Sequence, residues 1–314
     1  MADVDAGQRA LQDAWAVVSL GPSEAVVLSG DDTARWCHGM FTNEVKKLAP
    51  GQGNRHAACN DRGQVLGLLD LRRLDPTQVL LVLEGWTVGA FLDRYEKFLF
   101  LDDIEATDLR ATHTTLSVQG PATRAALAAA GLPAPAPGEV LPLTGGWASG
   151  RVRAFAEGVD FIVSHDDAAA LHDRLRAAGA AAAAPASLDA ARVAAGRPTW
   201  PTDANEKSLV HELGIAAALC SFSKGCYVGQ EVLNRVDIKG TIQKRATPLR
   251  FSGPVAAGAA LLLGEDNVGH VTSVAPAVDG PRGLGLVRRA AWEPGTQLQV
   301  EGGGTAEVLG DAIG

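Results

Sequence analysis

The sequence predicts an α+β fold in which two α+β subdomains precede a small antiparallel β-barrel or sandwich. Two observations predict it. Over residues 1–247, strand-type and helix-type patterns alternate irregularly, which favours α+β over a doubly wound parallel sheet. From about Pro248 onward, short β-type segments follow one another closely between Gly, Pro and Asp residues, which is typical of a small barrel or sandwich.

The first subdomain is expected to begin with two strands, at residues 17–20 and 26–28. Asp31 and Asp32 then offer a cap for a helix that runs toward Val45. Asn60-Asp61-Arg62-Gly63 is a good turn sequence between two strands. The other elements expected here are strands at 56–59, 64–74, 79–83 and near 104, and a helix at 88–98 whose exposed side carries Asp93, Tyr95 and Lys97.

A second unit of similar kind follows. A strand at 114–118, a helix at 121–130 with proline in its first turn, and a helix at 166–178 are expected. Residues 151–155 and 161–164 are expected to form a hairpin around Glu157-Gly158, and the alanine run at 180–184 is interpreted as composition bias. The candidate strands of the C-terminal region are 249–251, 260–263, 268–274, 284–287, 298–300 and 306–309.

The composition indicates a globular protein of a reducing compartment. The chain has 314 residues, 20% of them charged, and a formal charge of −8, which argues against a general nucleic-acid binder. We expect no membrane span and no signal peptide, because no apolar run is long enough for the first and the N-terminus lacks the basic and apolar regions of the second. The four cysteines are dispersed and fit no zinc spacing, so a cytoplasmic protein with free thiols and no metal site is expected.

The segment Lys224-Gly225-Cys226-Tyr227-Val228-Gly229-Gln230-Glu231, here called the cysteine motif, is the stretch most suited to chemistry. Its two glycines indicate a shaped turn, and Val232, Leu233 and Val236 indicate a short amphipathic helix from Gly229. Cys226 would then lie just ahead of a helix N-terminus, where the helix dipole and Lys224 favour the thiolate. The alternative is a small buried hydrophobe, an interpretation that suits Cys220 better.

Basic residues are concentrated around this motif. Between Lys224 and Arg250 there are six basic and two acidic side chains, a local excess of four positive charges in an acidic chain. Such an excess favours an anionic ligand. A solvated basic face is the alternative.

The cysteine motif, followed by Arg235, resembles the signature of the YgfZ-type folate-binding proteins, which are relatives of the glycine-cleavage T-protein, an aminomethyltransferase. Weaker similarities are Thr42-Asn43, the turn at 60–63 and Gly269-His270-Val271-Thr272-Ser273. The resemblance implies a T-protein-like folate-binding unit of two α+β subdomains over 1–247 and a C-terminal antiparallel β-barrel over 248–314.

The same resemblance implies what the protein does. It implies a protein that binds tetrahydrofolate and supports iron–sulfur cluster assembly or repair in client enzymes, with Cys226 as the functional thiol. The motif residues that it singles out are Lys224, Gly225, Cys226, Tyr227, Gly229, Gln230, Glu231 and Arg235, and its folate contacts are Asn60 and Arg245.

Two departures set this chain apart from the T-protein. The aspartate pair of the pattern Asn-Asp-x-Gly-Gly-x-x-Asp-Asp falls on Gly67 and Leu68, which cannot accept a proton. Asp70 is three residues from Gly67, an odd shift that changes the face of a strand. Ala194 stands where T-proteins have the glutamate that holds the pterin ring. Folate-dependent aminomethyl or methyl transfer is therefore an alternative that we do not expect, and a binding module of the same fold that has lost folate is a second alternative.

Overall fold

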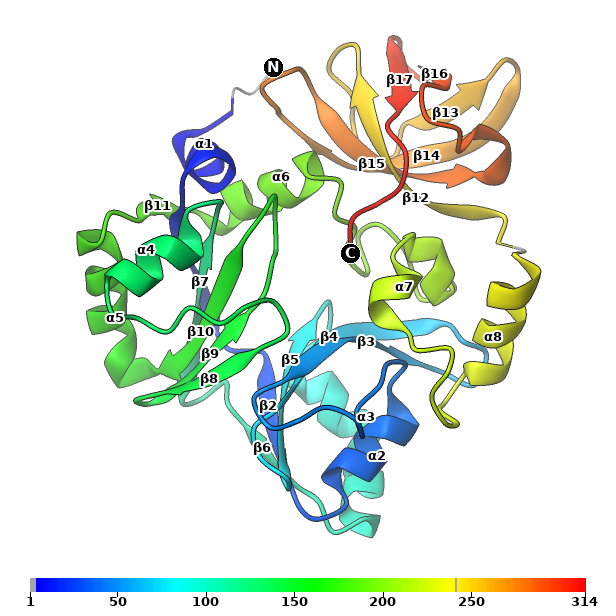
Figure 1. Ribbon diagram of the computed structural model, residues 1–314. Helices are drawn as coiled ribbons and strands as arrows, with labels where there is room; N and C mark the ends of the chain where they lie inside the picture. The colour runs from blue at the N-terminus through cyan, green and yellow to red at the C-terminus, as the bar shows by residue number, and fades with distance from the viewer. Residues whose placement is uncertain (1–3, 241) are drawn as a thin grey trace.

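Three β-structured bodies surround a common centre in the computed structural model, which describes residues 4–240 and 242–314 (Figure 1). Two of them are open sheets and the third is a closed barrel. The structure therefore confirms the predicted α+β class and the antiparallel barrel. The first barrel strand begins at Lys244, and the domain boundary at residue 247 stays a prediction.

The first sheet has five strands in the order β3-β4-β5-β2-β6. Alternate apolar residues of these strands face helices α2 and α3, where Leu81, Phe41 and Phe91 share one core. The elements are β2 (Ala25–Ser29), α2 (Thr33–Met40), β3 (Gly53–Cys59), β4 (Val65–Arg73), β5 (Gln78–Glu84), α3 (Val88–Leu101) and β6 (Glu105–Asp108).

The second sheet has six strands in the order β11-β1-β7-β10-β9-β8. The first strand of the chain lies here and not in the first sheet, because β1 pairs with β7 and with β11. The elements are α1 (Ala6–Asp13), β1 (Ala16–Pro22), β7 (His113–Gln119), α4 (Thr123–Ala129), β8 (Val140–Leu143), β9 (Gly146–Gly150), β10 (Gly158–Ser164), α5 (His165–Ala177) and β11 (Ala181–Ala183).

The two sheets pack against each other through an apolar layer. Val27 and Leu80 of the first sheet meet Ile162 of the second in this layer. The rest of the first sheet's inner face is covered by the segment between the second sheet and the barrel, where Leu213 and Leu219 pack on Leu68. This connecting segment contains α6 (Pro185–Ala194), η1 (Val210–Leu213), α7 (Ala216–Leu219) and α8 (Gln230–Lys239).

The barrel closes in the order β12-β15-β14-β13-β16-β17 around its own apolar core, which includes Leu249, Leu261 and Val287. The six predicted strands are all present, each close to its expected range. They are β12 (Lys244–Phe251), β13 (Ala260–Leu263), β14 (Asp266–Ala275), β15 (Arg282–Arg288), β16 (Gln297–Val300) and β17 (Thr305–Val308), with a short helix η2 (Arg289–Ala291) after β15. In the described part of the chain, no helix is both long enough and apolar enough to cross a membrane.

Several local predictions are wrong. The helix after Asp32 ends at Met40, well before Val45, and the Asp32 side chain makes no capping hydrogen bond. Tyr95 is buried at 2% exposure, because the core of α3 includes Phe91, Tyr95 and Leu99 at helical spacing. The pattern that placed it with Asp93 and Lys97 follows the spacing of a strand.

Two further predictions concern the second sheet. The hairpin partner of β10 is β9, residues 146–150, whereas residues 151–157 form a loop. The alanine run is not mere composition bias, because Ala181–Ala183 forms the parallel edge strand β11. Small side chains suit this position because α1 and α6 both lie close to it.

Asp203, in the connecting segment, joins the barrel to the rest of the molecule. Its buried carboxylate accepts hydrogen bonds from Thr272 Oγ1 at 2.7 Å and Ser273 Oγ at 2.6 Å, both on β14. The same carboxylate accepts from Arg192 Nη1 of α6 at 2.8 Å and from the Thr199 backbone N–H at 3.0 Å. One aspartate thus connects three parts of the fold, and the segment 269–273 contributes two of its partners.

Replacing Asp203 by Ala is expected to lower the free energy of unfolding by about 2–4 kcal/mol, since it removes a buried acceptor shared by Arg192, Ser273 and Thr272, of which Ser273 has no other acceptor among the described residues. Urea denaturation measures the change. Asp279→Ala is the matched control, because Asp279 pairs with Arg282 at the surface, where a pair contributes about 0–1 kcal/mol. Equal effects of the two variants would contradict this role of Asp203.

Candidate functional site

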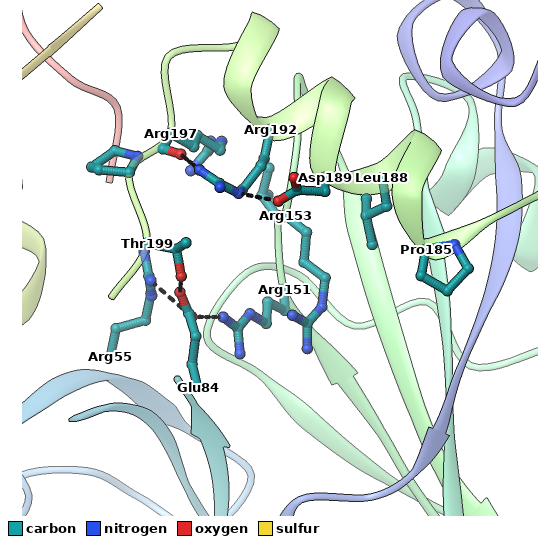
Figure 2. Close-up of a pocket in the computed structure, with 12 residues that line it drawn as sticks. Arg55, Glu84, Arg151, Arg153, Pro185, Leu188, Asp189, Arg192, Arg197 and Thr199 are labelled. Carbon is teal, nitrogen blue, oxygen red and sulfur yellow. Dashed lines mark hydrogen bonds and ion pairs between the residues drawn. The ribbon is translucent and has the colours of Figure 1, made fainter. Parts of the chain in front are cut away.

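A cavity of 220 Å³ opens at the centre of the molecule, where both sheets and the connecting segment meet, and we call it the arginine cavity (Figure 2). Guanidinium groups dominate its wall, with a few apolar and acidic side chains between them. It is lined by Arg55, Glu84, Arg151, Val152, Arg153, Pro185, Leu188, Asp189, Arg192, Arg197, Pro198 and Thr199.

A second cavity of 180 Å³ adjoins the first. It shares four wall residues with the arginine cavity, namely Arg55, Arg151, Val152 and Arg197. It adds Asp70, Arg72 and the backbone at Gly138, Gly150 and Gly314 to the wall. We therefore describe the two cavities as lobes of one central site, and together they approach the size of typical small-molecule pockets, about 300–1,000 Å³.

Glu84 is the acidic centre of the site. It lies at the end of β5, and its carboxylate accepts from Thr199 Oγ1 at 2.7 Å, from Arg55 Nη2 at 3.2 Å and from Arg151 Nη2. Burial by itself would raise the pKa of Glu84, but the positive charges of Arg151 and Arg55 and the Thr199 hydroxyl outweigh it and hold the pKa well below its usual range. Glu84 is thus ionised at neutral pH.

Behind this wall lies a second layer of paired charges. The guanidinium of Arg151 bridges Asp70 of β4 and Glu84 of β5. Buried Arg72 donates to Ser149 Oγ at 2.8 Å and to the Gly150 carbonyl at 3.1 Å, both at the end of β9. Charged side chains of the first sheet therefore reach into the loop that follows β9.

The cysteine motif lies elsewhere, against the end of α2. Lys224 is buried, and its Nζ donates to the carbonyls of His38, Phe41 and Asn43 at 2.6, 2.6 and 2.7 Å. Burial lowers the pKa of Lys224 to about 8, and the three carbonyls favour the charged form. All three of its N–H groups have backbone partners, so Lys224 fixes the loop and is not a hydrogen-bond donor to the thiol of Cys226.

Gly229 and Tyr227 of the motif also hold the loop in place. Gly229 has a left-handed φ of 83°, and a Cβ there would lie 2.7 Å from the Asn60 carbonyl oxygen, so only glycine fits. The ring of Tyr227 is buried with its centroid 4.7 Å from Lys224 Nζ. Glu231 and Arg235 form an exposed pair at 2.8 Å on the first turns of α8, which begins at Gln230, directly after Gly229, as predicted.

Cys226 itself is exposed on this loop, whereas Cys37, Cys59 and Cys220 are buried. Among the described residues, no disulfide forms and no group of three or more His, Cys, Asp or Glu side chains could hold a metal. The motif therefore presents one thiol outward on a fixed backbone. None of its residues lines the arginine cavity.

The predicted folate contacts are not brought to the cavity. Asn60 stabilises its own turn, since its Oδ1 accepts from the N–H groups of Arg62 and Gln64, both at 3.0 Å. Arg245 lies on β12, paired with Asp311 at 2.6 Å and stacked over Trp292. Their role in folate binding stays a prediction. Ala194 is buried and lines two other clefts, of 470 and 170 Å³, beside the barrel.

The aspartate pair of the T-protein pattern falls on residues 67 and 68, and both positions are tightly packed in this structure. A Cβ at Gly67 would lie 2.5 Å from the indole of Trp86, so that ring fills the space of a longer side chain. Leu68 is fully buried. Asp70 shares the face of Leu68, as the strand period requires, and is held in an ion pair with Arg151.

The basic stretch from Lys224 to Arg250 is not one patch. Lys224 is buried, while Arg235, Arg245 and Arg250 each have an acidic partner within 3.8 Å. These residues are spread over a loop, α8 and the barrel. The concentration of positive charge that suits an anion is the arginine cavity.

Sequence reasoning missed most of this cavity. Arg55, Glu84, Arg151 and Arg197 come from four separate segments, and none belongs to a short motif. The available signal was the set of charged residues inside strands that are otherwise apolar, such as Asp70 and Arg72 in the run from Val65 to Leu74, because buried charges require partners.

Comparisons with known proteins agree with this architecture. Residues 2–135 match the GCVT N-terminal domain, and residues 243–309 match the CAF17 C-terminal beta-barrel domain. The glycine cleavage system aminomethyltransferase T of Bartonella henselae has the same fold, with a TM-score of 0.86 and 21% identity over 97% of this chain and 87% of that one.

Two curated relatives cover almost the whole chain. A chloroplastic protein of Arabidopsis thaliana, named "putative transferase", is 23% identical over 90% of this chain and 68% of its own length. The aminomethyltransferase of Corynebacterium aurimucosum is 26% identical over 93% of this chain and 84% of its own.

Lys224→Met is expected to lower the free energy of unfolding by about 3 kcal/mol, because three buried carbonyl groups lose their donor. Urea denaturation followed by circular dichroism measures this. Lys239→Met, at an exposed position of α8, is the control and should change stability by less than about 0.5 kcal/mol. A Lys224→Met protein as stable as the control variant would show that the three hydrogen bonds contribute little.

Glu84→Gln is expected to weaken the pH dependence of stability in acid. The folded pKa of Glu84 lies below the unfolded value of 4.5, so the unfolded chain binds the extra proton as the pH falls. The stabilisation is complete above pH 4.5 and is lost as the pH falls toward the folded pKa. The free energies of unfolding of wild type and Glu84→Gln should therefore converge between about pH 6 and about pH 3. Glu96→Gln, a change at an exposed position of α3, is the control and should change the free energy of unfolding at neutral pH by less than about 0.5 kcal/mol. A constant gap between wild type and Glu84→Gln would contradict the assignment.

Proposed function

We propose that this chain, for which the two domain matches and the aminomethyltransferase relatives support the T-protein superfamily, is a YgfZ-type accessory protein. In this proposal it binds tetrahydrofolate and supports iron–sulfur cluster assembly or repair in client enzymes. The observation that carries the proposal is the cysteine motif, which presents exposed Cys226 on a loop held by Lys224 and Gly229. The CAF17-type barrel adds support from a second part of the chain.

The geometry of the loop suits a thiol that works on a partner protein. An exposed thiol can be reached by a disulfide or an iron atom of a partner protein, whereas a thiol buried in the core of this chain cannot. Because Lys224 and Gly229 fix the backbone on both sides, Cys226 is held in place without further contacts. This is the arrangement expected when a client protein, and not a small substrate in a cavity, meets the sulfur.

The central site suits a folate-type small molecule. Such a ligand combines a flat polar ring with carboxylates. The arginine cavity offers guanidinium donors, the ionised acceptor Glu84, and apolar surface from Pro185, Leu188 and Pro198. The site thus fits the group in chemical character, and it lies apart from Cys226, so ligand binding and thiol chemistry are separate functions of one molecule.

Folate-dependent aminomethyl transfer is the competing function, favoured by the names of the relatives. It needs a group that accepts or offsets positive charge beside the reacting nitrogen. Gly67 packs under Trp86, Leu68 is buried, and Asp70 is neutralised by Arg151. We therefore assign no transferase activity to this site.

We also propose that the protein works in the cytoplasm, because the reducing conditions there suit its four free thiols.

Cys226→Ala and Cys226→Ser are expected to abolish the ability of this protein to restore a client iron–sulfur enzyme in cells that lack it. The measurement is client activity and cluster content after expression of each variant. Ser223→Ala, an exposed change on the same loop, is the control and should restore fully. Full restoration by Cys226→Ala would remove the role assigned to the thiol.

Tetrahydrofolate is expected to bind the wild-type protein and to protect it against thermal unfolding, because a ligand that binds only the folded state stabilises it. Titration calorimetry measures the binding, and a methylamine donor added to the same mixture should give no turnover. Absence of heat and of protection would favour a module that has lost folate, and turnover would favour the transferase.

A further inference from the structure

The turn that carries Cys226 lies directly against the C-terminal end of α2. Lys224 Nζ donates to the carbonyl of His38, and the N–H of Val228 donates to the carbonyl of Gly39 at 3.1 Å. The residues on both sides of Cys226 are therefore held by two adjacent residues of the helix. This places the thiol beside the side chains at the end of α2.

His38 presents one ring nitrogen to this turn. A Cβ at Gly225, the residue before Cys226, would lie 3.6 Å from His38 Nε2. The His38 side chain is only 9% exposed. Its Nε2 nevertheless has no hydrogen-bond partner among the described residues, and the same is true of the Cys226 thiol. A largely buried imidazole thus turns an unpartnered nitrogen toward the backbone that carries the exposed sulfur.

The other ring nitrogen of His38 is already engaged by the protein. Nδ1 lies 3.3 Å from Glu44 Oε1, and the N–H of Val45 points to the same nitrogen at the longer distance of 3.4 Å. The negative charge of the carboxylate favours a proton on Nδ1, which leaves the lone pair of Nε2 facing the turn. Burial and the positive charge of Lys224 lower the pKa of His38, so the ring is neutral at neutral pH and can accept a proton.

We propose that His38 is the proton acceptor for the thiol of Cys226, and that Glu44 is the residue that positions the His38 ring. The S–H proton moves to Nε2, the electron pair of the broken S–H bond stays on the sulfur, and the Glu44 carboxylate balances the imidazolium at Nδ1. Lys224 cannot take this part, because its three N–H groups bond to backbone carbonyls.

The transfer requires a rotation of the Cys226 side chain or one bridging water molecule, because the thiol and Nε2 form no hydrogen bond to each other in the described structure. Cys226 directly follows Gly225, so either route is short. The inference rests on the proposed function only for the reaction in which the resulting thiolate is used.

Other titratable groups also act on His38. Lys224 of the cysteine motif and Lys46 and Lys47 of the loop after α2 lower its pKa, and His56 of β3 is a second histidine close enough to interact with it. These groups are the same in wild type and in each variant below. A comparison between the proteins at equal pH therefore isolates the contribution of the residue that is changed.

The test is the rate at which iodoacetamide alkylates Cys226 between about pH 6 and about pH 9. The sulfur attacks the iodinated carbon and iodide leaves, so the rate reports the thiolate, and the other three cysteines are buried. His38→Gln should react about tenfold more slowly than wild type at about pH 7, the effect of one charged hydrogen bond. The difference should disappear toward about pH 9, where an ordinary cysteine ionises without help.

Glu44→Gln should give a smaller loss with the same pH dependence, since it leaves the ring but removes its carboxylate partner. His165→Gln, a change at an exposed position of α5, is the control and should react like wild type. Circular dichroism and thermal unfolding check the fold, and Glu44→Gln carries the test if His38→Gln is unfolded. Equal rates at about pH 7, or a difference that is constant with pH, would overturn the inference, because a constant difference reports access to the sulfur and not proton transfer.

The two proposals fail separately, because alkylation needs no client protein. Equal alkylation rates overturn the inference about His38 and leave client restoration to decide the proposed function. If Cys226→Ala restores the client fully while His38→Gln is slow at about pH 7 and normal toward about pH 9, the proposed function is wrong and the inference about His38 stands.

Discussion

The ion pairs of Arg151 with Asp70 and Glu84 are the interaction on which the central site depends. Asp70 and Glu84 belong to neighbouring strands of the first sheet, and Arg151 follows β9 of the second. A buried charge is strongly unfavourable unless it is paired, so the three side chains can only be satisfied when the two sheets meet in this one arrangement. The walls of the arginine cavity, and the ionised state of Glu84, follow from that arrangement.

Around this centre the molecule separates two kinds of chemistry. The central site is built from both sheets and the connecting segment, and Asp203 connects that segment to the barrel. The thiol of Cys226 is exposed on a loop that Lys224 fastens to the end of α2. Under the proposed function, a ligand would bind at the centre while a protein partner reaches the sulfur from outside.

Much of the fold was predictable, because it depends on local patterns. The six barrel strands and the α+β class follow from short apolar runs between turn residues, and the glycine at position 229 could be predicted to shape a turn. Tyr95 and the end of α2 were not predictable in the same way. Whether a helix face is buried, and where a helix stops, depends on the neighbours that pack against it.

The sequence by itself determined that the chain carries one motif suited to thiol chemistry and lacks carboxylates at positions 67 and 68, since residue identity and local spacing suffice for both. Only the tertiary structure decided that Lys224 bonds to backbone carbonyls, that Asn60 and Arg245 lie away from the cavity, and that three distant segments bring their arginines together around Glu84. The reason is physical: the balance of buried charges is a property of the assembled interior, in which partners such as Arg151 and Glu84 are 67 residues apart along the chain.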